Sequence, residues 1–331
     1  MENELLYEMQ NAFPLTQTPF KELALKLNST EDAILTMVQK LKDEKIIRQT
    51  SAIFDTKRLG YTSSLVAFKV DEDKVDEAAH IINQHPGVSH NYLRNHDYNI
   101  WFTMAVEPQS KFGLEKTIEI LKEQTGAIDA ITLPTLKMFK ISVKMDTTGK
   151  RAKKEKVKKV SHKEIELTPE YIAVIKALQK DIAITQEPFK EMIEKLNMRY
   201  ERFFEIAHIL KDAGVMRRFA TILNHRKAGF GANAMSVWAV PEEKGEEIGR
   251  QMAEFSAVSH CYLRPSYPNW PYNLFAMIHG KSQEECDSLI EEMAKESGLT
   301  EYGKLYSTLE FKKQRLVYFD DAFKTWEAQV S

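Results

Sequence analysis

Two short segments of the chain carry side chains whose types and spacing could do chemistry. Residues 90–94 read HNYLR, and residues 260–264 read HCYLR. Alternate residues of a β-strand share one face of their sheet. Each segment would therefore present an imidazole, a phenol and a guanidinium together, from His90, Tyr92 and Arg94 in the first row and from His260, Tyr262 and Arg264 in the second. A single residue of these types usually packs or pairs with a neighbour, but a whole triple that occurs twice indicates a binding site.

Such a row suits a planar ligand that carries several carboxylates. The guanidinium of arginine binds a carboxylate through two parallel hydrogen bonds. Aromatic side chains cover the flat face of a ring system. Histidine either ligates a metal ion or moves a proton near neutral pH.

The two rows belong to an internal repeat that spans most of the chain. Residues 46–61 match residues 215–230 at an offset of 169, and the rows follow at an offset of 170. Tyr98-Asn99 then matches Tyr272-Asn273 at an offset of 174, so the second copy has four additional residues just after the shared arginine. The repeat predicts a tandem duplication and an intramolecular pseudo-dimer, and it leaves open whether copies of the chain assemble further.

The first part of each copy is typical of a winged helix-turn-helix. Ile34, Met37, Val38 and Leu41 follow the i, i+3, i+4, i+7 spacing of one buried helix face. The positions 169 later, in residues 203–210, keep that pattern. Two shorter helices precede this one, and the strands predicted to form the wings follow it at residues 46–54 and 215–223.

The second part of each copy alternates between strand and helix patterns. In the first copy we expect strands and helices in the order βαββαβ, over residues 64–70, 74–85, 88–94, 98–106, 112–126 and 128–141. This order is that of a ferredoxin-like sheet with helices on one face.

The predicted fold class is α+β, as a tandem duplication of a unit that resembles the Lrp/AsnC architecture. Seven of the ten residues 150–159 are Lys or Arg, and we interpret this run as part of a solvated linker. In each copy we expect a winged helix-turn-helix domain followed by a ferredoxin-like domain. The first copy has them at residues 1–58 and 59–144, the second copy has them at 169–227 and 228–331, and the basic linker at 145–168 joins the copies.

Composition excludes several classes of protein. The chain has 331 residues with Lys+Arg 46 against Asp+Glu 48, so its whole surface is not built to meet nucleic acid. Two cysteines in unrelated contexts exclude a disulfide scaffold and a thiolate zinc site. The acidic first residues do not resemble a signal peptide, and no apolar run approaches the roughly 20 residues of a membrane helix. We therefore expect a cytoplasmic protein without a membrane partner.

The winged helices raise the alternative of a ligand-responsive Lrp/AsnC-type DNA-binding transcription regulator. A recognition helix reads DNA mainly through its first turn. In the first copy that turn begins Ser29-Thr30-Glu31-Asp32, whose carboxylates would oppose the phosphates. In the second copy, Arg199 and Arg202 stand among Glu201 and Glu205. We therefore interpret the winged helices as retained scaffold and expect no nucleic-acid partner.

Longer segments around the rows resemble one enzyme family. Residues 90–104 (HNYLRNHDYNIWFTM) resemble one subunit type of siroheme decarboxylase. Residues 260–280 (HCYLRPSYPNWPYNLFAMIHG) and 217–241 (RRFATILNHRKAGFGANAMSVWAVP) resemble the partner subunit type. These enzymes, related to those called Ahb or NirDL/NirGH, are Lrp/AsnC-like, so the chain is similar to both subunits fused in one polypeptide.

The resemblance implies a carboxy-lyase that removes CO2 from the two acetate side chains on rings C and D of siroheme. The product would be 12,18-didecarboxysiroheme, a precursor of heme d1 or of protoheme. No cofactor is expected beyond the iron that the siroheme substrate carries, because the tetrapyrrole itself delocalises the charge left by CO2. A tetrapyrrole carrier that holds its ligand unchanged is a third hypothesis.

The resemblance also implies two active-site histidines, and we assign roles on that basis. The candidates for proton donor, carboxylate-positioning group or axial ligand of the substrate iron are His96, His90 and His260. Arg94 and Arg264 would clamp carboxylates, with a second set from the wings: Arg48, Arg217 and Arg218. The residues expected to line the macrocycle are Tyr92, Tyr98, Trp101, Tyr262, Trp270 and Tyr272.

The two copies are not equivalent around the rows. His96 lies in the segment Arg94-Asn95-His96-Asp97, whereas the second copy reads Arg264-Pro265-Ser266-Tyr267 and has no histidine there. Either one pocket alone is productive, or each half contributes to a composite site. The sequence leaves both alternatives open.

Overall fold

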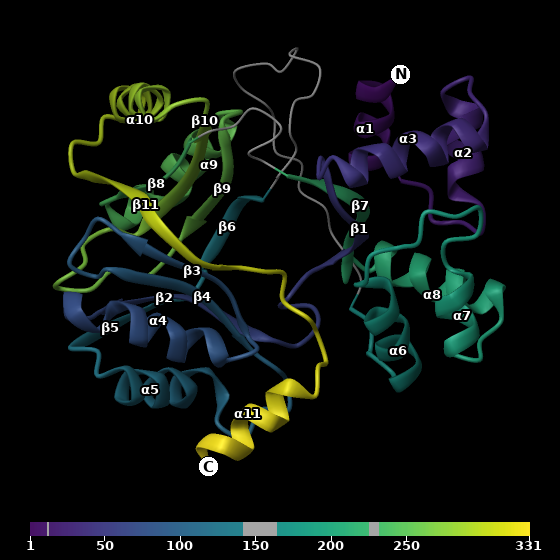
Figure 1. Ribbon diagram of the computed structural model, residues 1–331. Helices are drawn as coiled ribbons and strands as arrows, with labels where there is room; N and C mark the ends of the chain where they lie inside the picture. The colour runs from purple at the N-terminus through teal and green to yellow at the C-terminus, as the bar shows by residue number, and fades with distance from the viewer. Residues whose placement is uncertain (12, 142–163, 225–231) are drawn as a thin grey trace. The chain divides into compact units, whose positions relative to one another are not determined.

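The computed structural model describes residues 1–11, 13–141, 164–224 and 232–331, which fall into two compact units (Figure 1). The helical unit contains the described residues up to Gly60 and those from 164 to 224. The sheet unit contains residues 61–141 and 232–331. The predicted linker lies outside the described residues except for 164–168.

The helical unit contains the helix-turn-helix elements of both copies. Its elements are α1 (Glu2–Asn11), α2 (Pro19–Lys26), α3 (Glu31–Asp43) and β1 (Ile47–Phe54) from the first copy, and α6 (Pro169–Leu178), α7 (Lys190–Lys195), α8 (Tyr200–Asp212) and β7 (Met216–Leu223) from the second. Pro19 begins α2, where its missing N–H leaves no bond unmade. The hydroxyl of Thr30 caps α3 by accepting a hydrogen bond from the Ala33 amide at 3.3 Å. The predicted face of α3 is buried at Ile34, Val38 and Leu41.

The two wings pair with each other. Strands β1 and β7 form an antiparallel ribbon, in which Thr50 lies opposite Thr221. The two threonine hydroxyls are buried and hydrogen-bonded at 2.8 Å between their Oγ1 atoms. Arg217 of β7 forms an ion pair with Asp55, just after β1, at 2.7 Å. The ribbon therefore joins the two copies through a buried polar contact and an ion pair.

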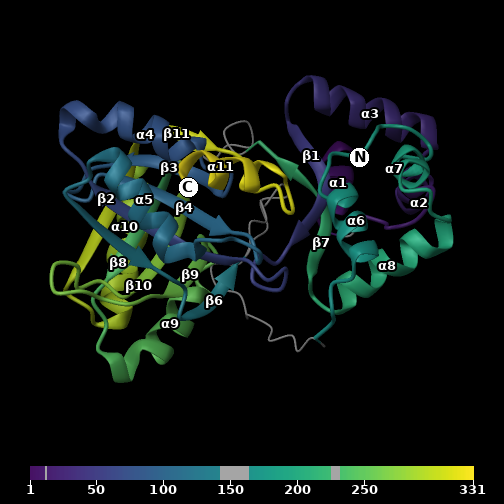
Figure 2. The same ribbon diagram turned by 90° about the horizontal axis from the view of Figure 1, so that it is seen from below.

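The sheet unit confirms the βαββαβ order in both copies (Figure 2). Its first-copy elements are β2 (Thr62–Lys69), α4 (Val75–Gln84), β3 (Val88–Arg94), β4 (Ile100–Val106), α5 (Gly113–Thr125), β5 (Asp129–Leu133) and β6 (Lys137–Ile141). Its second-copy elements are β8 (Ala232–Trp238), α9 (Gly245–Glu254), β9 (Val258–Leu263), β10 (Leu274–Gly280), α10 (Gln283–Ser297), β11 (Tyr302–Lys313) and α11 (Ala322–Val330). Within the described residues, the strands of the two copies form one sheet in the order β5-β2-β4-β3-β11-β8-β10-β9-β6.

The prediction of one last strand over residues 128–141 was wrong. The structure divides this segment into β5 and β6 at Pro134, which has no N–H to donate to a ladder. Strand β5 pairs with β2 of its own copy, whereas β6 pairs with β9 of the other copy. Strand β11 of the second copy is not divided, but it also pairs with both copies. Its first part pairs with β8 of its own copy, and its second part pairs with β3 of the first copy. The copies therefore exchange the ends of their last strands.

Two lysines hold the exchanged strands against the helices of the other copy. Lys140 of β6 is buried and donates to the Phe255 carbonyl, directly after α9, at 2.9 Å. Lys312 of β11 occupies the equivalent register position and donates to the Asn83 carbonyl in α4 at 2.8 Å. Both ammonium groups lie at the C-terminal end of a helix, where backbone carbonyls lack helical partners and favour a cation.

Each half of the sheet has one face covered by helices and one face turned to the other half. Helices α4 and α5 pack on strand residues of the first copy such as Val66 of β2 and Phe102 of β4. Helices α9 and α10 pack on the strands of the second copy in the same way. The opposite faces share a separate core, which contains Trp101 from β4, Val237 from β8 and Leu305 from β11. This shared face is where alternate residues of β3 and β9 lie.

The Thr50–Thr221 contact gives a test of the wing pairing. Thr50→Val or Thr221→Val leaves the other hydroxyl buried without its partner, so we expect each to lower the free energy of unfolding by about 1–3 kcal/mol. The double variant removes both polar groups, and its loss should be smaller than the sum of the single losses. Urea unfolding of the four proteins measures this coupling, and strictly additive losses would contradict a direct contact between the two wings.

Candidate active site

The two rows share a face as the strand pattern predicts. In β3 the ring centroids of His90 and Tyr92 are 6.2 Å apart, and the Arg94 guanidinium carbon lies 5.5 Å from the Tyr92 centroid. In β9 the corresponding distances are 6.0 Å for His260 and Tyr262 and 4.8 Å for Arg264 over Tyr262. The structure therefore confirms that imidazole, phenol and guanidinium stand side by side in both copies.

A β-bulge precedes the histidine of each row. The register between β3 and β4 shifts between Val88 and His90, and the register between β9 and β10 shifts in the same way around Ser259. A bulge places two residues opposite one, and thereby re-aims the side chains next to it. Ser89 and Ser259 use this geometry to bring their hydroxyls to 3.0 and 2.8 Å from the Nδ1 atom of the histidine that follows each of them.

The two row arginines are buried cations. Arg94 and Arg264 are 6% and 8% exposed. Arg94 Nη1 donates to the Leu305 carbonyl at 2.9 Å, and Arg264 Nη1 donates to the Leu133 carbonyl. Each of these carbonyls belongs to the opposite copy. Each Nε is buried without a hydrogen-bond partner among the residues that the structure describes. Neither guanidinium forms an ion pair with a carboxylate of those residues, although an isolated buried charge destabilises a folded protein.

Burial lowers the pKa of both arginines to about 10, mainly through desolvation of the guanidinium. Both side chains therefore remain cationic at neutral pH. A buried cation that still has donors to offer is well suited to bind the carboxylate of a ligand.

His96 lies in the turn after β3 and is half-buried. Its Nδ1 accepts a hydrogen bond from the Tyr98 amide at 3.1 Å, which places the proton of a neutral ring on Nε2. Desolvation lowers its pKa, more than the nearby Asp97 carboxylate raises it. The ring packs edge-on against Trp270 with centroids 5.1 Å apart. Desolvation therefore favours the neutral ring of His96, and the bond from the Tyr98 amide favours its tautomer with the proton on Nε2.

The additional residues of the second copy reach the first copy beside His96. Asn269, in that segment, donates to the Tyr98 hydroxyl oxygen and, at 2.9 Å, to Asp129. The Tyr98 hydroxyl donates to the same Asp129 carboxylate at 2.6 Å. Burial, then this carboxylate, raises the pKa of Tyr98 to about 12. Sequence analysis missed Asn269 and Asp129, although the four-residue length difference marked the segment.

The two tryptophans expected to line the macrocycle are interior side chains. Trp101 and Trp270 are 1% and 0% exposed, and their ring centroids are 5.2 Å apart. The Trp101 indole donates to the Tyr98 carbonyl at 2.6 Å. The Trp270 indole N–H is buried without an acceptor in the described part of the chain, and its ring also packs against Tyr272. A ligand would meet these rings only after neighbouring side chains move, so their lining role stays a prediction.

The three wing arginines belong to the helical unit. Arg217 is paired with Asp55, as described above, and Arg48 is exposed. Burial and the neighbouring Arg217 lower the pKa of Arg218. The structure does not place these residues in one compact unit with the rows, and their participation in the site stays a prediction.

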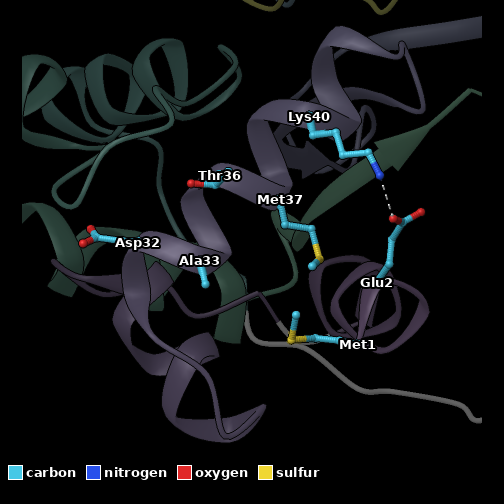
Figure 3. Close-up of a pocket in the computed structure, with 7 residues that line it drawn as sticks. All are labelled: Met1, Glu2, Asp32, Ala33, Thr36, Met37 and Lys40. Atoms are coloured by element: carbon cyan, nitrogen blue, oxygen red, sulfur yellow. Dashed lines mark hydrogen bonds and ion pairs between the residues drawn. The ribbon is translucent and has the colours of Figure 1, made fainter.

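A depression of about 410 Å³ also lies in the helical unit, over α1 and α3 (Figure 3). Lys40 reaches across it to Glu2 at 3.5 Å, and apolar side chains such as Met37 line its floor. It contains none of the predicted site residues.

The described residues provide neither a cluster of metal ligands nor a membrane-spanning helix. They contain no group of three or more His, Cys, Asp or Glu side chains arranged to hold a metal ion. Their helices include none that is both long and apolar enough to cross a membrane.

The Tyr98–Asp129 hydrogen bond predicts a pH-dependent stability. The pKa of Asp129 is lowered chiefly by the Tyr98 hydroxyl, so the bond stabilises the folded protein above the unfolded carboxyl pKa of about 3.9. This stabilisation is lost as the pH falls through the folded-state pKa. We expect Tyr98→Phe to lower the free energy of unfolding at about pH 6, and the difference from wild type to shrink in acid. Urea unfolding across this range checks it, and a difference that grows in acid would contradict the assignment.

The sequence and the structure were compared with known proteins. A profile described as the AsnC-like ligand binding domain matches residues 58–140 and 227–312, and one described as the siroheme decarboxylase NirDL-like HTH domain matches residues 2–48. The chain is 42% identical over 324 residues to the siroheme decarboxylase of Hydrogenobacter thermophilus. The alignment covers 98% of this chain and 96% of that protein.

Two crystal structures of the siroheme decarboxylase NirDL also match, one of them in co-complex with an iron-uroporphyrin III analogue. Their TM-scores are 0.81 and 0.80 at 37% and 36% identity, and each match covers 100% of this chain and 98% of that chain. These relatives are matched along nearly their whole length, with the repeated AsnC-like domain in both copies. The chain therefore belongs to the siroheme decarboxylase family.

Proposed function

We propose that this chain removes CO2 from the two acetate side chains on rings C and D of siroheme and forms 12,18-didecarboxysiroheme. Each acetate would lose CO2 and take up one proton, which leaves a methyl group. Family membership supports this reaction, as does the iron-uroporphyrin III analogue in the NirDL complex. The observation that carries the proposal is the pair of buried arginines, each beside a His–Tyr pair and without a carboxylate partner among the described residues.

The arginines would bind carboxylates of the tetrapyrrole. Arg94 and Arg264 each use one nitrogen on a backbone carbonyl, and each retains a buried Nε without a partner in the part of the chain described. A carboxylate brought to these donors would gain charge-assisted hydrogen bonds and would neutralise a buried cation. Arg48, Arg217 and Arg218 remain proposed as a second set of carboxylate clamps.

The histidines would handle the proton and the substrate iron. Loss of CO2 leaves an electron pair on the CH2 carbon, and a positioned imidazole N–H is suited to protonate it. His96 would present its Nε2–H, because Nδ1 already accepts the Tyr98 amide. The neutral ring would position the leaving carboxylate through this N–H, and it would protonate the carbon only from its doubly protonated form. His90 and His260 are the further candidates, either as acid or as axial ligand of the iron. Beyond that iron, we propose that no cofactor takes part.

The aromatic residues would cover the faces of the macrocycle. Tyr92 and Tyr262 lie within the rows, next to the arginines. Tyr98, Trp101 and Tyr272 pack around Trp270. Flat aromatic surfaces of this kind favour a planar ligand over an extended one.

The regulator hypothesis is disfavoured by the charges of the helical unit. The Arg202 guanidinium is held by Glu170 at 2.6 Å and by Glu205 at 2.8 Å. In the first copy, Glu31 and Asp32 stand in the first turn of α3. We therefore propose that the winged helices are scaffold, that the protein acts in the cytoplasm without a nucleic-acid partner, and that it serves the synthesis of heme b or heme d1.

Anaerobic incubation of the purified chain with siroheme tests the reaction directly. We expect a product lighter by two CO2 in mass spectrometry. Loss of a single CO2 would indicate that the unequal copies process different acetates or differ greatly in rate. An absorbance change without a mass change would identify a carrier. Salt-sensitive binding to specific DNA without any effect on siroheme would return the regulator hypothesis to first place.

The carboxylate clamps predict a loss of binding. Arg94→Met and Arg264→Met each remove charged hydrogen bonds worth about 1.5–3 kcal/mol, so each should raise the Kd for siroheme by roughly 10- to 100-fold. Absorbance titration measures the Kd. Arg202→Met in the helical unit is the matched control, because it removes an arginine whose carboxylate partners are already present. The proposed clamps would be contradicted if Arg94→Met and Arg264→Met bound siroheme with the same Kd as the control Arg202→Met.

A further inference from the structure

We propose that Ser259 and His279 position His260 and supply it with a proton, so that the row of the second copy protonates the carbon that CO2 leaves. This inference rests on the proposed function and names the residues that serve its proton step. His260 would contact the substrate, whereas Ser259 and His279 would act through it.

The three side chains form a short hydrogen-bonded chain. The Ser259 hydroxyl oxygen lies 2.8 Å from His260 Nδ1 and 2.7 Å from His279 Nε2. Ser259 is the residue at the bulge of β9 and is 5% exposed, whereas His279 stands on β10. Both distances are those of good hydrogen bonds, and burial of the serine strengthens them.

A single hydroxyl between two imidazoles couples their protonation. Serine has one hydrogen to donate, so it donates to one neighbour and accepts from another. When His279 carries a proton on Nε2, it donates to Ser259. The serine hydroxyl is then directed to Nδ1 of His260 at 2.8 Å in preference to the Met277 carbonyl, which lies farther away at 3.4 Å. A neutral His260 then carries its proton on Nε2, on the opposite side of the ring from the serine.

The same chain can move one proton along its length. As the C–C bond to the carboxylate breaks, its electron pair stays on the CH2 carbon and CO2 departs. That pair forms a C–H bond with the proton from His260 Nε2, while the Ser259 hydroxyl proton moves to Nδ1 and the His279 Nε2 proton moves to the serine oxygen. A doubly protonated His279 thereby becomes neutral, and because it is only half-buried it regains its proton from water.

The first copy lacks this chain. Ala105 of β4 occupies the position of His279, since its amide donates to the Gly87 carbonyl at 3.0 Å just as the His279 amide donates to Ala257 at 3.1 Å. Ser89 still bonds His90 at 3.0 Å. Among the described residues, the two rows share a serine–histidine pair, and the second row has His279 where the first has Ala105.

Steady-state kinetics on siroheme tests the proposal. His279→Ala gives the second copy the residue that the first copy has, and we expect kcat to fall by about 10- to 100-fold with little change in KM. Ser259→Ala should do the same, and Ser259→Thr, which keeps the hydroxyl, should recover most of the rate. Wild-type kcat in His279→Ala would overturn the proposal.

Solvent isotope effects separate proton supply from mere packing. Two or more protons that move together give a curved dependence of kcat on the deuterium fraction of the solvent. We expect this curve for wild type and a straight line for His279→Ala and Ser259→Ala. Ser89→Ala is the matched control in the first copy and should keep the curve. A curve that persists in His279→Ala would overturn the proposal.

Nitrogen NMR of the histidine-labelled full chain gives a readout that needs no turnover. His279→Ala should shift the ring-nitrogen resonances of His260 toward another tautomer and leave those of His90 in place. Unchanged His260 resonances would overturn the coupling. A wild-type chain that leaves the mass of siroheme unchanged would overturn the proposed function and the proton delivery with it. An active wild type with an unaffected His279→Ala would overturn the relay alone.

Discussion

The exchange of strand ends between the two copies is the constraint on which the sheet unit depends. Strand β6 of the first copy pairs with β9, and the second part of β11 pairs with β3. Each row therefore has a strand of the other copy beside it. The row arginines form a second link between the copies, since each donates to a carbonyl of the opposite copy, at Leu305 or Leu133. Folding of either copy alone would leave its row strand without this neighbour.

Contacts between the two copies satisfy only part of the hydrogen-bonding capacity of the buried row arginines. A buried guanidinium without a counter-anion destabilises a fold unless its remaining donors find acceptors. Arg94 and Arg264 satisfy one donor each on backbone and leave Nε buried without a partner in the described residues. The lowered pKa of about 10 reflects the same burial. Such an arrangement lowers stability locally, and in the proposed function it would give the arginines a strong attraction for a carboxylate of the ligand.

Sequence patterns predicted what is local and missed what depends on distant pairing. Alternation placed His90, Tyr92 and Arg94 on one face, and helical spacing identified the buried face of α3. The division at Pro134 was not predicted, because the apolar pattern continues through it and the partner of β6 lies in the other copy. The link from Ser259 to His279 was not predicted either, because a bulge and a neighbouring strand create it. Residues that act through another side chain carry no spacing signal of their own.

Fusion of the copies in one chain allows the two rows to differ. In a symmetric dimer of identical chains every substitution appears twice, so both sites change together. Here His279 contacts the serine before one row, and Ala105 occupies its position in the other copy, while His96 and the Asn269 segment each occur in one copy. The rows thus have the same serine, histidine, tyrosine and arginine and differ in the groups that reach them from neighbouring strands and turns. In the proposed reaction the two acetates lie on different rings of one asymmetric macrocycle, and a fused chain would allow a separate environment for each.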